Sequence, residues 1–216
     1  IFPALAVANK LVEINDQIEI RFVGAEGRME MTKVPAAGYP ITGLPVMGFP
    51  RKPSVRLFTF VAKLIKSMRR AKRMVKDFKP HIAVGFGGYA SGPAMKAAAS
   101  SGVPMVLQEQ NSYAGITNKL LAKKAVKICV AYDNMEKYFP KEKIILTGNP
   151  IRKDLLNIPG SKELACHPYG FDNQKTTVFV TGGSLGARSI NEAVLKNIDY
   201  FESNNIQLLW QCGSLY

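Results

Sequence analysis

Residues 178–191 contain the feature that most constrains the fold of this chain, because they join a strand to a helix through a glycine-rich turn. The apolar, β-branched run at 178–180 is followed by Gly-Gly-Ser-Leu-Gly at 182–186. Apolar residues three and four positions apart then mark one helical face over 190–201, and a second apolar run occupies 206–210. This order predicts a βαβ unit with two parallel strands.

A glycine turn at the start of a helix also has a chemical use. Glycine lets the backbone approach a ligand closely, and the first helical turn leaves N–H groups that favour a phosphate. Gly182, Gly183 and Gly186 are therefore candidate phosphate-binding residues. A tight βα turn without a ligand would contain the same glycines, so the rest of the chain must separate the two interpretations.

The remaining chain predicts an α/β fold with parallel sheets, because strand and helix patterns alternate. We expect helices over 1–14, 25–31, 54–79, 94–100 and 115–126, and strands over 18–23, 82–84, 103–107, 127–131 and 143–147. A boundary near Asn149 would divide the chain into domains at 1–149 and 150–216.

A polar run, Gln108-Glu109-Gln110-Asn111, directly follows the strand expected over 103–107. Polar side chains are costly in a core, but they are common in the ligand crevice that lies at the carboxyl ends of parallel strands. We therefore favour a binding role for this run over a structural one.

The charge balance indicates an anionic partner. The 29 Lys and Arg residues exceed the 16 Asp and Glu residues and give a net charge of +13, which suits nucleic acid, anionic lipid or a phosphorylated substrate. Eleven of the basic residues lie within 51–79, opposite an apolar face at helical spacing from Leu57 to Phe78.

This basic helix has two interpretations. It presents a solvated face, as charge runs usually do, or it binds a membrane with anionic head groups. Each basic residue contributes about 1 kcal/mol near such a membrane. The candidate membrane contacts are the basic residues and neighbouring aromatics Arg56, Lys63, Lys66, Arg70, Phe58 and Phe60.

Several classes of protein are disfavoured. Cys129, Cys166 and Cys212 are widely spaced and only two histidines are present, so we expect reduced thiols and no metal site. The sequence contains no run of about twenty apolar residues, so we expect no transmembrane helix. The chain begins at Ile1 without a Met and ends just after a predicted strand, so we interpret it as a fragment.

Six motifs occur in a fixed order along the chain. They are Ile-Phe-Pro-Ala-Leu-Ala-Val-Ala at 1–8, Gly-Gly-Tyr-Ala-Ser-Gly-Pro at 87–93, Glu-Gln-Asn at 109–111, Gly-Ile-Thr-Asn-Lys at 115–119, Gly-Asn-Pro-Ile-Arg at 148–152 and Gly-Gly-Ser-Leu-Gly-Ala-Arg at 182–188. Together they resemble the MurG family of bacterial N-acetylglucosaminyltransferases. The resemblance spans almost the whole chain.

The resemblance implies a GT-B fold, in which two Rossmann-like domains face each other, with the second domain incomplete in this chain. The implied reaction moves N-acetylglucosamine from UDP-N-acetylglucosamine to the 4-hydroxyl of undecaprenyl-linked lipid I, forming lipid II for peptidoglycan. The resemblance also implies that the reaction inverts the configuration at the sugar. It implies no metal, no cofactor and no nucleic-acid partner. The protein would act peripherally at an anionic membrane surface, on the cytoplasmic face of the bacterial inner membrane.

The resemblance also assigns residues. Ser184 and the backbone of 182–186 would hold the diphosphate, Arg152 would contact UDP as a charge-assisted donor, and Asn111 would hydrogen-bond the donor sugar. Supporting positions are Tyr89, Glu109, Gln110 and Asn191. The family's N-terminal glycine loop, which ends in a His, would precede Ile1, and its uracil and ribose sites would follow Tyr216. The general base is therefore unassigned, and we expect the fragment itself to be inactive.

Three alternatives remain. Another GT-B enzyme, such as a diacylglycerol glycosyltransferase or a nucleotide-sugar epimerase, would share the glycine turn. A nucleic-acid-binding module would explain the positive charge, although the basic residues are not interleaved with a stacking platform. A peripheral membrane protein with a degenerate sugar site would keep only the basic helix.

Overall fold

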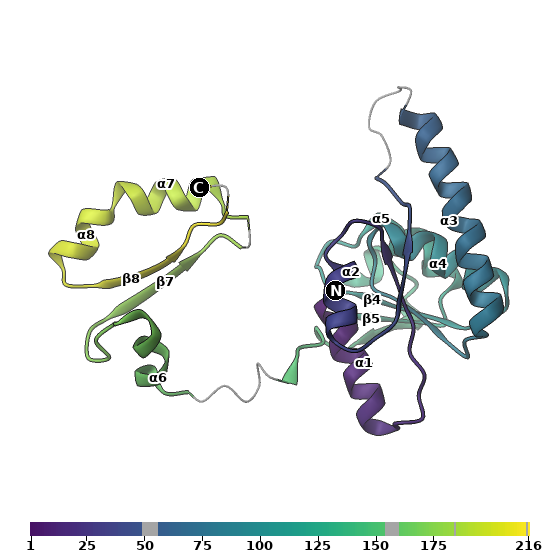
Figure 1. Ribbon diagram of the computed structural model, residues 1–216, viewed down its shortest axis with the longest axis horizontal. Coiled ribbons are helices and arrows are strands. Elements are labelled where there is room, and N and C mark those ends of the chain that lie inside the picture. Colours follow the sequence, from purple (N-terminus) through teal and green to yellow (C-terminus); the bar gives the residue numbers. More distant parts are fainter. Residues whose placement is uncertain (49–55, 154–159, 184, 215) are drawn as a thin grey trace. The chain divides into compact units, whose positions relative to one another are not determined.

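The computed structural model describes residues 1–48, 56–153, 160–183, 185–214 and 216 (Figure 1). The chain forms two compact units, Ile1–Leu156 (unit 1) and Asn157–Tyr216 (unit 2). Every strand pair of the described residues is parallel, which confirms the expected α/β class. The expected domain boundary near residue 149 remains a prediction.

Unit 1 alternates helices and strands from its first residues (Figure 1). Its α-helices are α1 (Phe2–Ile14), α2 (Glu30–Ala36), α3 (Arg56–Phe78), α4 (Gly88–Ser100) and α5 (Ile116–Leu121). Its strands are β1 (Phe22–Ala25), β2 (Ile41–Leu44), β3 (Ala83–Gly85), β4 (Met105–Glu109), β5 (Lys127–Val130) and β6 (Ile144–Leu146). Short 3₁₀ turns are η1 (Ala122–Lys124), η2 (Met135–Lys137) and η3 (Lys141–Lys143).

Two parallel sheets form the strand framework of unit 1. One sheet pairs β1 with β2, and the other has the order β3-β4-β5-β6. In the second sheet Gly85 lies opposite Leu107, and Glu109 lies opposite Val130. Because the strands are parallel, their carboxyl ends meet at one edge, and this edge carries the polar run that begins at Gln108.

The core of unit 1 has two parts. One joins β4, β5 and η2 through buried residues such as Leu107, Ile128 and Met135. The other joins β2, α3 and α4 through the buried residues Leu44, Ala71, Val75, Ala97 and Ala98. The small alanine side chains let α3 approach α4 closely, which makes α3 and α4 one packed pair.

Some predicted element boundaries are wrong. β1 begins at Phe22 rather than residue 18, because its pairing to the β2 region starts where Phe22 N donates to Pro40 O at 2.8 Å. A helix was expected over 25–31, but α2 runs from Glu30 to Ala36 and contains Pro35. α4 begins at Gly88 rather than residue 94, since Gly87 adopts a φ of 78° and caps it.

The apolar face of α3 is buried along only part of the helix. Its second half packs on α4 through Ala71 and Val75, but Val61 and Ile65 remain 46% exposed and Phe58 is 80% exposed. Figure 1 shows the first turns of α3 extending beyond the rest of unit 1. The first half of the helix therefore presents its apolar stripe to solvent.

Unit 2 contains the predicted βαβ arrangement. Its elements are α6 (Lys162–Cys166), η5 (His167–Tyr169), β7 (Thr177–Thr181), α7 (Arg188–Lys196), α8 (Ile198–Ser203) and β8 (Gln207–Gln211). β7 and β8 pair in parallel, with Phe179 opposite Leu209. The single helical face expected over 190–201 is broken at Asn197, whose side chain donates to Ala193 O at 2.8 Å and ends α7.

Candidate functional site

The carboxyl end of β4 carries the predicted polar run in a graded environment. Gln108 and Glu109 are buried, Gln110 is half-buried and Asn111 is exposed. Buried polar groups are stable only when they have hydrogen-bond partners, so the contacts of these side chains indicate their roles.

A chain of amide groups joins the ends of three strands. Gln110 Nε2 donates to Phe86 O, just after β3, at 3.3 Å, and it also donates to Gln108 Oε1. Gln108 Nε2 lies 3.5 Å from Asn149 Oδ1, beyond β6, and Asn149 Nδ2 donates to Gln110 O at 3.2 Å. The network therefore fixes the sheet edge at which a ligand crevice is expected, and Gln110 connects its members.

Glu109 anchors α5 to this edge. The residue is 3% exposed, and its Oε2 accepts from Gly115 N at 2.9 Å and from Asn118 Nδ2 at 3.0 Å. Gly115 is the N-cap of α5, and Asn118 Nδ2 also donates to Gln108 O at 3.1 Å. Asn118 was not a predicted site residue, because only the fold brings it against β4. Its place in the 115–119 motif was the one available signal.

The first turn of α4 borders the same edge. Gly87 and Gly88 adopt φ values of 78° and 81°, a region that glycine occupies without strain. Thr117 Oγ1 donates to Gly88 O at 3.3 Å and so links α5 to α4. Tyr89 is 58% exposed in this turn, so its ring is available to a ligand.

Four predicted residues thus gather at one end of unit 1, namely Tyr89, Glu109, Gln110 and Asn111. Their arrangement places an exposed rim over a buried, hydrogen-bonded base. The rim also includes the N–H groups that the first turn of α4 leaves without helical partners. Such a rim can hydrogen-bond a hydroxyl-rich or anionic ligand.

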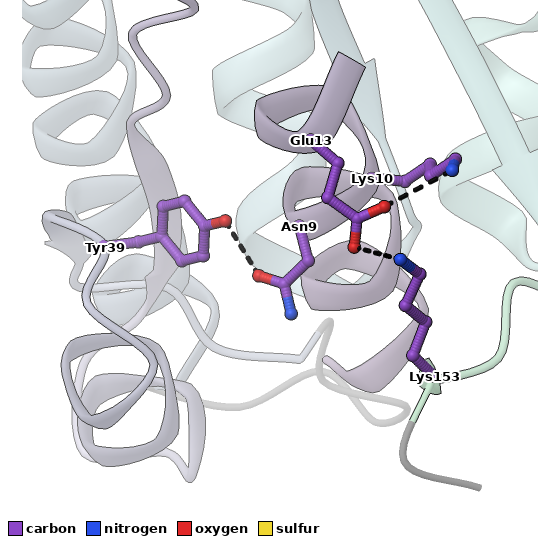
Figure 2. Close-up of polar contacts among 5 residues, drawn as sticks. All are labelled: Asn9, Lys10, Glu13, Tyr39 and Lys153. Carbon is purple, nitrogen blue, oxygen red and sulfur yellow. Dashed lines mark hydrogen bonds and ion pairs between the residues drawn. The ribbon is translucent and has the colours of Figure 1, made fainter. Parts of the chain in front are cut away.

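Arg152 follows β6 and lies against α1. Its guanidinium is 5.1 Å from the centre of the Phe2 ring. The neighbouring Lys153 forms an ion pair of 2.7 Å with Glu13, and Lys10 contacts the same carboxylate at 3.3 Å (Figure 2). The hydrogen bond from Lys153 holds the pKa of Glu13 below its ordinary value. These contacts fix the backbone that carries Arg152, whose role toward UDP remains a prediction.

In unit 2, backbone packing shapes the turn after β7. Gly186 adopts a φ of 80°, and a Cβ atom at this position would overlap the carbonyl oxygen of Cys212. A Cβ atom on Gly182 would lie 2.8 Å from Ala187 Cβ. Both positions therefore require glycine for the turn to keep its shape. Ser184, the predicted diphosphate ligand, lies outside the described residues.

Gly183 and Asn191 complete the predicted residues of unit 2. Gly183 has a φ of 82°, and its N–H donates to Thr181 Oγ1 at 3.2 Å. Asn191 is 3% exposed. Its Nδ2 donates to Cys212 O at 2.9 Å, while its Oδ1 accepts from Trp210 Nε1 at 3.1 Å. Asn191 therefore ties α7 to the end of β8, and its supporting role toward a ligand remains a prediction.

The predicted membrane residues have different surroundings on α3. Lys63 and Lys66 are exposed, whereas Arg70 pairs with Glu26 at 2.7 Å and holds α3 to the turn after β1. Phe58 is exposed and Phe60 is half-buried. Arg56 is the first residue of α3, and its side chain lies outside the described part.

Two further properties of the described residues bear on function. None of their helices is both long and apolar enough to cross a bilayer. They contain no group of three or more His, Cys, Asp or Glu side chains that could hold a metal ion. All three cysteines are free thiols, and burial raises the pKa of Cys129.

Comparison with known families accounts for both units. Residues 1–130 match the glycosyltransferase family 28 N-terminal domain, and residues 177–215 match the glycosyltransferase family 28 C-terminal domain. The chain belongs to glycosyltransferase family 28. The polar edge of unit 1 lies within the N-terminal match, and the glycine turn of unit 2 lies within the C-terminal match.

Individual relatives within family 28 agree along the whole chain. The UDP-N-acetylglucosamine--N-acetylmuramyl-(pentapeptide) pyrophosphoryl-undecaprenol N-acetylglucosamine transferase of Phocaeicola vulgatus is 56% identical over 216 residues, and the transferase of the same name from Flavobacterium psychrophilum is 50% identical. Both matches cover 100% of this chain, but only 57% and 59% of the relatives. The chain therefore spans less than two thirds of the length of these relatives.

Similar solved structures show that the chain has a GT-B fold. MurG of Acinetobacter baumannii is similar with a TM-score of 0.68 and 28% identity, covering 99% of this chain and 57% of that one. A UDP-GlcNAc 2-epimerase from Neisseria meningitidis has a TM-score of 0.62 at 13% identity, over 98% of this chain and 64% of that one, which shows a shared fold alone. The expected resemblance to the MurG family and the expected fold are confirmed.

Proposed function

We propose that the complete protein transfers N-acetylglucosamine from UDP-N-acetylglucosamine to the 4-hydroxyl of the N-acetylmuramyl sugar of lipid I. The observation that carries this proposal is the 56% identity, along all 216 residues, to a transferase whose name states this donor and an N-acetylmuramyl-(pentapeptide) pyrophosphoryl-undecaprenol acceptor. The polar edge of unit 1 and the glycine turn of unit 2 supply the two kinds of contact that the reaction needs. The product is lipid II, the precursor of peptidoglycan.

The proposed chemistry is a single displacement with inversion. The acceptor oxygen attacks the anomeric carbon, the bond from that carbon to the diphosphate breaks, and UDP leaves with the bonding electrons. A general base takes the acceptor proton, and no described residue is assigned to that role. The protein must therefore hold the sugar, stabilise the departing diphosphate and exclude water.

We assign these tasks to the predicted residues. The backbone of 182–186 and Ser184 hold the diphosphate, because a glycine turn ahead of a helix can present N–H groups to a phosphate. Arg152 supplies a charge-assisted contact to UDP, and Asn111 hydrogen-bonds the donor sugar. The reaction as proposed uses neither metal nor cofactor, since N–H groups and Arg152 carry the charge stabilisation.

Transfer assays on the complete gene product test the proposal. Radiolabelled UDP-N-acetylglucosamine is offered with a lipid I analogue, with diacylglycerol or alone. Label in the lipid I analogue is expected. Label in diacylglycerol, or epimerised nucleotide sugar without an acceptor, would replace the proposal with one of the other GT-B activities. Asn111→Ala should reduce kcat/KM at least about tenfold, whereas the exposed Asn9→Ala should not change it.

We further propose that the first half of α3 docks the enzyme on the cytoplasmic face of the inner membrane. Phe58, Val61 and Ile65 form an exposed apolar stripe, and Lys63 and Lys66 are exposed on other faces of the same helix. A helix with an apolar stripe and basic side chains on its other faces can lie in the head-group region of an anionic bilayer. This arrangement suits a peripheral enzyme whose acceptor is a lipid.

Vesicle co-sedimentation tests the docking surface. Lys63→Glu/Lys66→Glu should release the protein from vesicles that contain anionic lipid, and Phe58→Ser/Val61→Ser should do the same without a change of charge. Lys124→Glu/Lys141→Glu is the matched control, because both lysines are exposed on other elements of unit 1. Equal release by Lys63→Glu/Lys66→Glu and by the control, without release by Phe58→Ser/Val61→Ser, would indicate a general charge effect and contradict docking through α3. Salt-sensitive binding of nucleic acid that UDP-N-acetylglucosamine does not alter would favour the nucleic-acid alternative.

A further inference from the structure

Both oxygens of the Glu109 carboxylate accept hydrogen bonds at the carboxyl end of β4. Oε1 accepts from Asn111 N and Asn111 Nδ2, both at 3.1 Å. Oε2 accepts from Gly115 N at 2.9 Å and from Asn118 Nδ2 at 3.0 Å. Four N–H donors therefore surround a side chain that is almost completely buried.

The four donors define the hydrogen-bonding role of both carboxyl oxygens. Each of them is an N–H group, which can only donate, so both oxygens must act as acceptors. An oxygen that already accepts hydrogen bonds from two N–H donors is poorly placed to take a proton from a substrate hydroxyl. The geometry thus argues against Glu109 as a general base.

The same contacts determine how Asn111 is presented. Its backbone N–H and its side-chain Nδ2 are both held by Oε1 of Glu109, although the residue itself is exposed. Since the amide group is planar, fixing Nδ2 also fixes the direction of Oδ1. Gly115 and Asn118 hold Oε2 at the start of α5, so the whole loop 110–115 is attached to β4 through one carboxylate.

We propose that Glu109 is a positioning residue that orients Asn111 toward the donor sugar, so that Asn111 Oδ1 accepts a hydrogen bond from a sugar hydroxyl. This proposal rests on the proposed glycosyltransferase function and goes beyond it. It assigns Glu109 an action through Asn111 and excludes it from the proton transfer. The sugar portion of the substrate, rather than UDP, is the part whose binding depends on Glu109.

The test uses the complete gene product and the variant Glu109→Gln, which retains size but places an NH₂ group where an acceptor is required. Its affinity for UDP-N-acetylglucosamine should fall about tenfold, because at least one N–H donor loses its acceptor. Its affinity for UDP should change less than about twofold. Glu136→Gln is the matched control, since Glu136 is exposed in the same unit. Equal losses for both ligands in Glu109→Gln would overturn the proposal.

A double-mutant cycle tests whether the effect passes through Asn111. When Asn111 is already Ala, Glu109→Gln should lower the affinity for UDP-N-acetylglucosamine by less than about a further twofold, because the residue that Glu109 orients is gone. Additive losses would contradict the proposal. The pH profile of kcat/KM for Glu109→Gln should keep the shape of the parent enzyme, whereas loss of the acidic limb would identify Glu109 as the base.

Hydrogen exchange separates this proposal from the proposed function. The amides of Asn111 and Gly115 should exchange at least about tenfold faster in Glu109→Gln, whatever reaction the protein catalyses. Unchanged exchange would overturn the positioning role, while absence of transfer by the parent enzyme would overturn only the function. If Glu109→Gln does not fold, Glu109→Asp replaces it in every measurement, because it keeps the charge but withdraws the oxygens by one methylene.

Discussion

The polar edge of unit 1 and the glycine turn of unit 2 occupy equivalent places, after a parallel strand and before a helix, but they are held by different means. In unit 1, side chains hold the loop, since Glu109 and Asn118 connect β4 to α5. In unit 2, main chain packs on main chain, because Gly186 lies against Cys212. In unit 1, single hydrogen bonds can be removed one at a time by substitution. In unit 2, a single added Cβ atom at Gly186 would overlap the backbone.

The largest expected effect is on the backbone-supported turn. Gly186→Ala should destabilise unit 2 by about 3 kcal/mol or more, because it combines a φ of 80° with overlap on the Cys212 carbonyl. Urea unfolding followed by fluorescence of Trp210, the single tryptophan of the chain, measures the change.

Gly183→Ala is the matched control. Gly183 has nearly the same φ of 82°, but a Cβ atom there meets nothing within 4 Å. Only the conformational cost of about 1–2 kcal/mol should remain. Similar losses for the two variants would mean that backbone strain, and not close packing, defines the turn.

A smaller loss of stability than that of Gly186→Ala is expected when a side chain of the unit 1 network is changed. Asn118→Leu removes the donor to Gln108 O and Glu109 Oε2 with little change in volume, and it should cost about 2 kcal/mol. Faster amide exchange over 110–118 would accompany the loss. Asn9→Leu, which removes an exposed 2.7 Å contact to Tyr39 (Figure 2), should cost clearly less. Equal costs would contradict the view that burial makes the unit 1 network important.

The smallest effect concerns the exposed ion pair between Lys153 and Glu13. Because the folded protein lowers the pKa of Glu13, the pair stabilises the fold above the ordinary pKa of a glutamate. That contribution is lost as the pH falls through the lowered value. Thermal unfolding of Lys153→Met should therefore differ slightly from the parent at neutral pH and not at all in strong acid.

Lys10→Met is the control for the ion pair, since it leaves the 2.7 Å contact between Lys153 and Glu13 intact. The difference in thermal unfolding between Lys10→Met and the parent should depend less on pH than the difference between Lys153→Met and the parent. A Lys153→Met difference that persists in strong acid would show that packing against α1, rather than charge, holds the segment after β6.

Much of the fold could be predicted because it depends on local patterns. The alternation after Pro80 gave the parallel strands, and apolar spacing gave α1 within one residue of the expected start. Boundaries at glycine and proline were harder. Gly87 is the N-cap of α4 and has a positive φ. Pro93 lies inside the same helix, because tertiary packing outweighs intrinsic propensity.

The site was predictable in its residue types but not in its connections. The run 108–111 indicated a crevice, since polar side chains after a buried strand need a reason. The contact of Asn118 with Glu109 depends on how α5 folds back on β4, and that of Asn149 with Gln108 joins positions 41 residues apart. Spacing along the chain carries no signal for such contacts. For α3, helical periodicity correctly gave the element but could not show which half of its apolar stripe is covered.

The place of Gly48 has a consequence for Tyr89. The chain leaves β2 and passes Gly48, where a Cβ atom would lie 2.9 Å from the hydroxyl oxygen of Tyr89. Glycine at position 48 thus leaves room for the hydroxyl group of an exposed tyrosine of the rim. A larger side chain there would have to displace that hydroxyl group, so residue 48 limits the positions that the Tyr89 ring can take at the rim.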